Sequence, residues 1–127
     1  MCIDSINPKK CENDTYTVIL EPYSVGELLA FVFASNFDFK TFSEKKSCFS
    51  NRFEEKIAVD GFNLIDDPHA SQGIGTKPFD DEGVKTNPNN LVQDGIFTST
   101  FSNLFDSYKE GNIESTGNAA RPGSPMG

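Results

Sequence analysis

Histidine, cysteine and tryptophan are the residues that this sequence lacks or nearly lacks. It has no tryptophan, one histidine (His69) and three cysteines, at positions 2, 11 and 48. The cysteines form no C-x-x-C pair, and a zinc knuckle would need more ligands than one histidine and scattered cysteines supply. An odd number of cysteines without a close pair predicts reduced thiols, as in a cytosolic protein.

Long apolar runs are also missing, and the 11 basic residues are outnumbered by 19 acidic ones. The longest apolar stretch runs from Leu28 to Ala34, whereas a membrane-spanning helix needs about 20 apolar residues. The formal net charge is −8, and an acidic surface repels phosphate, so we predict no direct binding to nucleic acid. No basic segment followed by an apolar one begins at Met1, so no signal peptide is predicted. We therefore expect a cytoplasmic protein without membrane contact.

The sequence contains no motif for nucleophilic catalysis or for nucleotide binding. It has no G-x-S-x-G, no P-loop, and no Cys/His pair with an orienting residue. His69 is the one candidate base, and it follows Asp66-Asp67-Pro68 in a segment rich in Gly and Ser. We interpret it as a polar loop residue.

What the chain does have is enough apolar material for one small domain. It contains 127 residues, twelve of them phenylalanine. Residues 1–14 are polar and predict a linker or connector between domains. The segment from Tyr16 to Leu20 is rich in β-branched and aromatic residues, which predicts a strand.

A helix is predicted to follow that strand. Pro22 is well tolerated in a first helical turn, and Ser24 and Glu27 have the spacing of a capping box. The helix should extend to about Asn36. Its apolar residues lie nearly all round the helix axis, so we predict that it is buried. They are Leu28, Leu29, Phe31, Val32 and Phe33.

The second half of the sequence predicts short strands and a hairpin. Residues 62–65 should form a strand that ends in the turn at 66–68, and residues 83–86 another. Residues 91–93 and 96–101 flank Asp94-Gly95, which is typical of a type I′ hairpin turn, because both residues tolerate positive φ.

A short helix should end this half of the sequence. Asn103 can cap it, it should extend through Glu110, and Gly111 can end it. The predicted class is α+β, with antiparallel hairpins, one buried helix and one short helix.

Two groups of polar residues are candidate sites. The acidic clusters Asp66-Asp67 and Asp80-Asp81-Glu82 could offer oxygen ligands to calcium or magnesium, but their spacing does not match an EF-hand. We favour turn capping by these side chains. A carboxylate-based metal enzyme that uses Asp80 to Glu82 is a less favoured option. Asn118 and Arg121 lie beside Gly117, and Arg121 could hold a carboxylate of a partner loop or peptide. A purely structural turn is the alternative there.

Four segments in order carry a resemblance to a known family. They are Ile65 to Pro68, Phe79 to Val84, Asp94 to Ile96 and Ser115 to Arg121. Together they resemble the first half of the C-terminal domain of the TldD/PmbA proteins, also called modulators of DNA gyrase. The resemblance implies a cytoplasmic peptidase system. It also implies that residues 15–127 are part of a larger domain, truncated at its C-terminal end.

The metal-binding helix of the catalytic branch is the part that departs from this resemblance. TldD proteins have H-E-x-x-x-H after a V-x-L strand, where two histidines bind zinc and the glutamate acts as general base. Aligned on Val18 to Leu20, the three motif positions here hold Glu21, Pro22 and Gly26. Proline cannot act as a base and glycine has no side chain to bind metal. Glu21-Pro22 before an apolar helix instead resembles the PmbA/TldE branch.

We therefore predict a non-catalytic, PmbA/TldE-like subunit fragment that holds no metal or cofactor of its own. The resemblance implies a TldD-like catalytic partner that carries the zinc, and a peptide substrate. Self-association is the alternative assembly. The alternative function is a protein-interaction module without a peptidase role. The three degenerate motif positions give the chain no catalytic residue. The residues predicted to contact the partner or the peptide are Asp80, Asp81, Glu82, Asn118 and Arg121.

Overall fold

The computed structural model describes residues 6–73 and 75–120. A continuous helical run comes first and has three parts: α1 (Pro22–Leu28), a π-helical turn η1 (Leu29–Phe33) and a 3₁₀ turn η2 (Ala34–Phe37). The predicted helix to about Asn36 is thus confirmed. The predicted capping box is wrong, because Ser24 lies inside α1 and the extended Glu21 is the N-cap. Pro22, with its φ already helical, starts the helix earlier.

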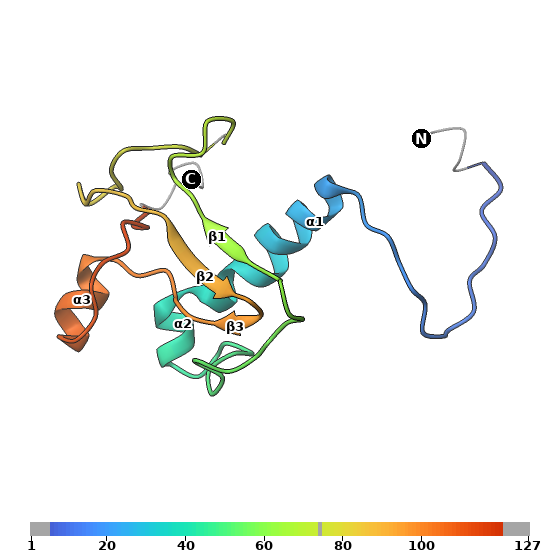
Figure 1. The fold of residues 1–127 in the computed structure, drawn as a ribbon, viewed down its shortest axis with the longest axis horizontal. Helices are drawn as coiled ribbons and strands as arrows, with labels where there is room; N and C mark the ends of the chain where they lie inside the picture. The colour runs from blue at the N-terminus through green and yellow to red at the C-terminus, as the bar shows by residue number, and fades with distance from the viewer. Residues whose placement is uncertain (1–5, 74, 121–127) are drawn as a thin grey trace.

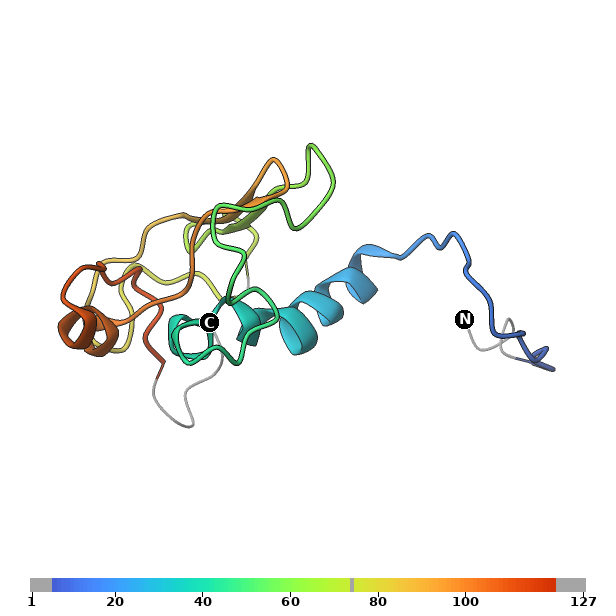
Figure 2. The ribbon, with the colours of Figure 1, turned by 90° about the horizontal axis from the view of Figure 1, so that it is seen from below.

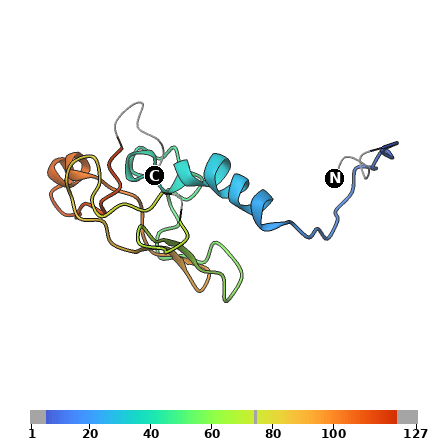
Figure 3. The ribbon, with the colours of Figure 1, turned by 90° about the horizontal axis from the view of Figure 1, so that it is seen from above.

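The burial predicted for this helix is wrong. In Figures 1, 2 and 3, α1 leads away from the body of the molecule towards the N-terminal segment. No residue of α1 or η1 is buried, and Phe31 is 75% exposed. An apolar helix is buried only where another element packs against it. Here Phe37, at its C-terminal end, is the one residue of the helical run that is buried.

The strand predicted at Tyr16 to Leu20 is also wrong. These residues form neither helix nor strand, and Ile19 is 98% exposed. Apolar β-branched residues favour an extended backbone, but a strand also needs a neighbour to complete its hydrogen bonds. Among the described residues, none supplies that neighbour. Residues 6–14 likewise form no helix or strand, and their role as a linker stays a prediction.

Three strands form one antiparallel sheet in the order β1-β2-β3. They are β1 (Leu64–Asp66), β2 (Asn89–Gln93) and β3 (Ile96–Phe97). Leu64 pairs with Val92, and Asp66 pairs with Asn89. The register shifts between Leu64 and Ile65. The first strand therefore begins two residues later and ends one residue later than predicted. Residues 83–86 are not a strand, because only Lys85 makes an isolated bridge, to Phe79.

The predicted hairpin at Asp94-Gly95 is confirmed, although β3 ends at Phe97 and not at residue 101. Asp94 has φ 50° and Gly95 has φ 78°, as a type I′ turn requires. The turn is also held from outside. Gly95 accepts hydrogen bonds from the N–H groups of Ile57 (2.8 Å) and Ala58 (3.1 Å). Gly61 donates its N–H to Asp94 Oδ1 at 2.6 Å.

Aromatic side chains form the centre of the core. Phe97 is fully buried, and its ring lies against four other phenylalanine rings with centroid distances from 5.4 to 5.8 Å. Three of these contacts are edge-to-face, which is a favoured geometry for aromatic pairs. The rings come from η2, from α2 (Phe39–Ser43) and from the loop that follows α2. They belong to Phe37, Phe42, Phe49 and Phe53.

The short helix α3 (Leu104–Glu110) is confirmed as predicted. Asn103 is its N-cap and accepts the N–H of Asp106 at 2.9 Å. Gly111 ends it in the left-handed conformation, with φ 71°. With three strands and short helices, the predicted α+β class is confirmed.

We expect Gly95→Ala to destabilise the protein by about 2–4 kcal/mol, because alanine at this position has both the cost of a positive φ and a steric clash. A Cβ at Gly95 would lie 2.6 Å from the carbonyl oxygens of Ala58 and Val59. Gly111→Ala is the matched control, because its φ is also positive but its Cβ would meet nothing within 4 Å. It should cost about 1 kcal/mol. Urea unfolding measures both values, and equal losses would contradict the close approach at Gly95.

Candidate functional site

The three positions of the degenerate metal motif lie at the start of α1. Glu21 is exposed and extended, and its carbonyl accepts the N–H of Val25 at 3.1 Å. Pro22 fills the first helical position. Gly26 lies one turn further on and lines a cleft, whereas Glu21 and Pro22 do not.

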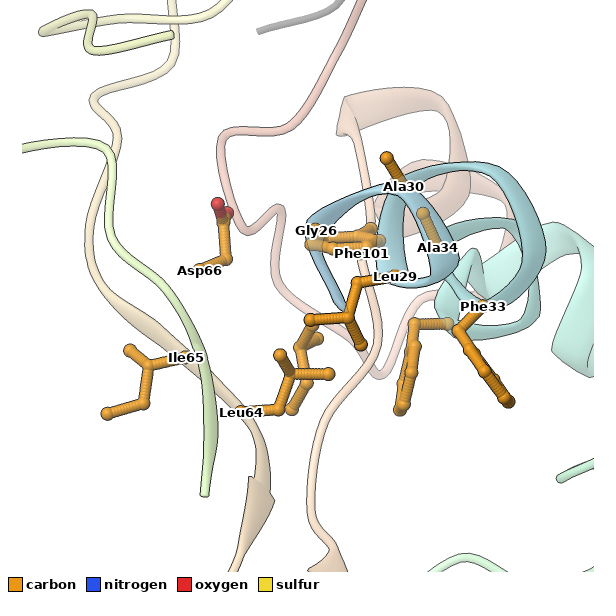
Figure 4. A pocket seen from close by; sticks show the side chains of 11 residues that line it. Gly26, Leu29, Ala30, Phe33, Ala34, Leu64, Ile65, Asp66 and Phe101 are labelled. Carbon is orange, nitrogen blue, oxygen red and sulfur yellow. The ribbon is translucent and has the colours of Figure 1, made fainter. Parts of the chain in front are cut away.

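This cleft, called the Gly26 cleft below, opens between the helical run and β1 and has a volume of about 250 Å³. In Figure 4, Leu29 and Leu64 lie between the helix and the strand, Asp66 lies apart from the helix, and Ile65 points away from it. Apart from Asp66, the lining is apolar. It consists of Gly26, Leu29, Ala30, Phe33, Ala34, Phe37, Leu64, Ile65, Asp66, Leu91 and Phe101.

The residues around this cleft do not fit a zinc site. Catalytic zinc in proteins needs about three ligands from His, Cys, Asp or Glu. Among the described residues, Asp66 is the one such residue that lines the Gly26 cleft, and neither Pro22 nor Gly26 carries a ligating side-chain atom. Within residues 6–73 and 75–120, no group of three or more such side chains lies close enough to hold a metal ion.

Asp80 is buried, with 3% exposure, and organises the acidic loop from within. Its Oδ1 accepts the N–H groups of Glu82 (3.0 Å) and Val84 (2.9 Å), and its Oδ2 accepts that of Ala119 (3.0 Å). Asp81 also donates its N–H to the carbonyl of Ala119 at 3.2 Å. The loop is thus tied to the segment at residue 119, and turn capping, the favoured interpretation, fits Asp80.

Glu82 ties this loop to α3. The N–H of Leu104, the first residue of α3, donates to Glu82 Oε2 at 2.8 Å. A helix leaves its first N–H groups without partners inside the helix, and a carboxylate there satisfies one of them. Contacts of Asp80, Asp81 and Glu82 with a partner or a peptide stay predictions.

Asn118 lies next to the Gly26 cleft. Its Nδ2 donates to Asp66 Oδ2 at 2.7 Å, and its Oδ1 accepts the hydroxyl of Thr116 at 2.6 Å. The structure therefore joins two residues that are 52 positions apart. Asp66 was considered only as a possible cation ligand beside Asp67 and was not predicted as a contact, although two of the four family motifs contain this pair. Arg121, also predicted as a contact, lies outside the described residues.

His69 is held by its neighbours. Its Nε2 lies 3.2 Å from the hydroxyl of Thr86, which is buried and donates to the carbonyl of Lys77 at 2.5 Å. The backbone N–H of His69 donates to Asp67 Oδ1 at 3.0 Å. These bonds give the side chain a structural role in the loop, in line with its interpretation as a loop residue.

Asp106 is a buried acid that the sequence did not single out. It is 6% exposed, and its Oδ2 has no hydrogen-bond partner among the described residues. Burial raises the pKa of its carboxyl above the usual 3.8, and Asp38 and Glu82 add to the increase by charge repulsion. A backbone hydrogen bond from Asn103 and the charge of Lys109 oppose it.

Comparison with known families identifies the chain. The profile of the PmbA/TldA metallopeptidase C-terminal domain matches residues 13–127. The chain belongs to this family. The resemblance to TldD/PmbA proteins predicted from four short motifs is thereby confirmed.

Relatives of known sequence carry the family's metalloprotease names. The chain is 33% identical over 75 residues to the metalloprotease PmbA homolog of Buchnera aphidicola, covering 59% of the chain and 17% of that protein. It is 37% identical over 73 residues to a metalloprotease of Methanothermobacter thermautotrophicus, covering 58% of the chain and 16% of the relative. The chain thus spans about a sixth of the length of these curated relatives.

Solved structures share its fold. TldE from Thermococcus kodakarensis superposes with a TM-score of 0.69 at 27% identity, over 81% of this chain and 24% of that one. A protein of Bacteroides thetaiotaomicron named for modulation of DNA gyrase gives 0.66 at 27% identity, over 76% and 22%. In the described part of this chain, no helix has the length and apolar character to cross a membrane.

We expect Asp80→Ala to destabilise the protein by about 2–5 kcal/mol, because three backbone N–H groups lose their acceptor in a buried place. Asp80→Asn should cost less, since its remaining oxygen can still accept from Glu82 and Val84. The control is Asp60→Ala, whose side chain is 84% exposed in an ion pair with Lys56. Urea unfolding ranks the three variants, and an Asp80→Ala loss no larger than that of the control would contradict this role.

We expect Asp106→Asn to be more stable than the wild type at neutral pH. A folded-state pKa above the unfolded value means that the folded state binds the proton more tightly. The stabilisation that the protonated Asp106 gives the wild type is therefore fully present below the pKa of this carboxyl in the unfolded state. It is lost as the pH rises through the pKa of the carboxyl in the folded state. Urea midpoints from about pH 3 to about pH 7 should show the two proteins converging at low pH. A variant less stable at neutral pH would contradict this assignment.

Proposed function

We propose that this chain is a non-catalytic, PmbA/TldE-like part of a metallopeptidase system. One observation carries the proposal: the three metal-motif positions hold Glu21, Pro22 and Gly26 at the start of α1, where the described residues offer no set of zinc ligands. Membership of the PmbA/TldA metallopeptidase family, and the likeness to a solved TldE, support it.

In this proposal the zinc and the general base belong to a TldD-like partner with an H-E-x-x-x-H helix. This chain contributes an interface and part of the wall around the peptide. The exposed apolar residues of α1 and η1 support the interface, because burying apolar surface is the main favourable contribution to association. The proposed compartment is the cytoplasm, and the free, exposed Cys11 and Cys48 fit a reducing environment.

A protein-interaction module without a peptidase role is the second candidate. The same exposed helix favours it, together with residues 16–20, which are exposed and form neither helix nor strand. The carboxylate-based metal enzyme at Asp80 to Glu82 is disfavoured. Asp80 already accepts three backbone N–H groups and Glu82 accepts that of Leu104, so these oxygens serve the fold.

We expect the purified chain to contain well under one zinc per molecule and to cleave no peptide alone. Mixed with a TldD-like protein that has the intact motif, it should co-elute and raise the rate of peptide hydrolysis. Elemental analysis and a quenched-fluorescence peptide assay measure these outcomes. The matched control is a partner whose motif glutamate is replaced by glutamine, which should be inactive with or without this chain.

Two results would decide against the proposal. Chelator-sensitive cleavage by the chain alone, with one tightly bound zinc per molecule, would make it a catalytic subunit. If the chain co-elutes with the partner but the rate of peptide hydrolysis does not change, the result would favour the interaction module.

A further inference from the structure

The Gly26 cleft can take up one bulky apolar side chain. It has about 250 Å³ of space, and its walls come from the helical run, from β1, and from Leu91 and Phe101. Gly26 keeps one wall open, because a Cβ built on it would meet nothing within 4 Å. Burial of an apolar side chain in such a space is favourable in proportion to the area removed from water.

The charge at the cleft has one sign. Asp66 is the one charged residue among the described residues that line it, and it is half-buried. Asn118 Nδ2 donates a hydrogen bond to Oδ2 of the Asp66 carboxylate. A carboxylate has about four lone-pair sites, and this bond uses one of them. Asp67 follows in the chain, so the electrostatic potential at this end of the cleft favours a cation.

We propose that the Gly26 cleft binds a peptide segment through one bulky apolar side chain, with an adjacent cationic group at Asp66. This proposal rests on the proposed function, since the peptide would be a substrate or product of the peptidase system. It adds a preference for apolar residues next to lysine, arginine or a free amino terminus.

The charges argue for a cationic peptide over a second copy of this chain. Each copy has a formal net charge of −8, and like-charged copies repel each other. A second copy would also have to bring a positive charge to Asp66. Within the chain, Lys77 lines a neighbouring cavity of about 340 Å³ together with Asp66, Asp67 and Asn118, but it does not line the Gly26 cleft.

The test is an NMR titration of the full ¹⁵N-labelled chain with the peptide acetyl-Gly-Leu-Lys-Gly-amide. Amide shifts of Leu64, Asp66 and Gly26 should move together and give one dissociation constant. Two matched peptides separate the two parts of the proposal. Replacing leucine by glycine should weaken binding about tenfold or more, from the lost apolar burial. Replacing lysine by glutamate should weaken it by about two- to fivefold or more.

Two variants and one control locate the binding on the chain. Gly26→Leu adds apolar bulk at a residue that lines the cleft, where a Cβ would meet nothing within 4 Å, and should weaken binding about tenfold or more. Asp66→Asn should weaken binding of the lysine peptide only, because asparagine can still accept from Asn118. Phe31→Ala is the control, since Phe31 is exposed on the same helical run but does not line the cleft. It should leave binding unchanged.

Several outcomes would overturn the proposal. One is Gly26→Leu binding the peptide as tightly as the wild type. Another is an equal loss with Phe31→Ala, which would mean unspecific binding to the apolar helix. A third is a shift of the cleft amides with protein concentration alone, which would assign the cleft to a second copy. Because these measurements use neither zinc nor activity, their failure is separate from that of the proposed function.

Discussion

The burial of Phe97 is the interaction on which the rest of the structure depends. This side chain has no exposed surface and contacts four phenylalanine rings from η2, from α2 and from the loop after α2. It is placed there by the hairpin, because β3 pairs Phe97 with Val92 directly after the Asp94-Gly95 turn. A change in this turn would displace Phe97 and with it the packing of the helical run against the sheet. The position of the Gly26 cleft depends on the same contact, since the cleft lies between that run and β1.

Acidic side chains in this protein have more than one physical role. Asp80 and Glu82 are acceptors for backbone N–H groups, so their sequence cluster stabilises a loop and a helix end. Asp66 lies at the edge of an apolar cleft, oriented by a single amide. Asp106 is buried with an oxygen that lacks a partner among the described residues, which is unfavourable for its charged form. The residue type is the same in each case, and burial and hydrogen-bond partners determine what it does.

The features predicted correctly depend on contacts close in sequence. Asn103 caps α3 through the N–H three residues later, and Gly111 ends it. The Asp94-Gly95 turn follows from the φ angles that its own two residues tolerate. The predicted strand at 16–20, the buried helix and the strand at 83–86 depend instead on a partner elsewhere in the chain. Their residue types were right for those structures. The described residues, however, supply no partner strand for residues 16–20, bury the helical run only at Phe37, and give one bridge for residues 83–86.

The candidate site divides in the same way. The amino acids at positions 21, 22 and 26 are read directly from the sequence, and their lack of metal-binding atoms follows from their chemistry alone. The sequence also determined the net negative charge and the family-specific motifs. Only the tertiary structure decided that Gly26 faces a cleft, that Asn118 orients Asp66, and that Asp80 is buried. Each of these depends on segments that fold together from distant positions, as the 52 residues between Asp66 and Asn118 illustrate. A local pattern carries no information on which distant segment will supply the contact.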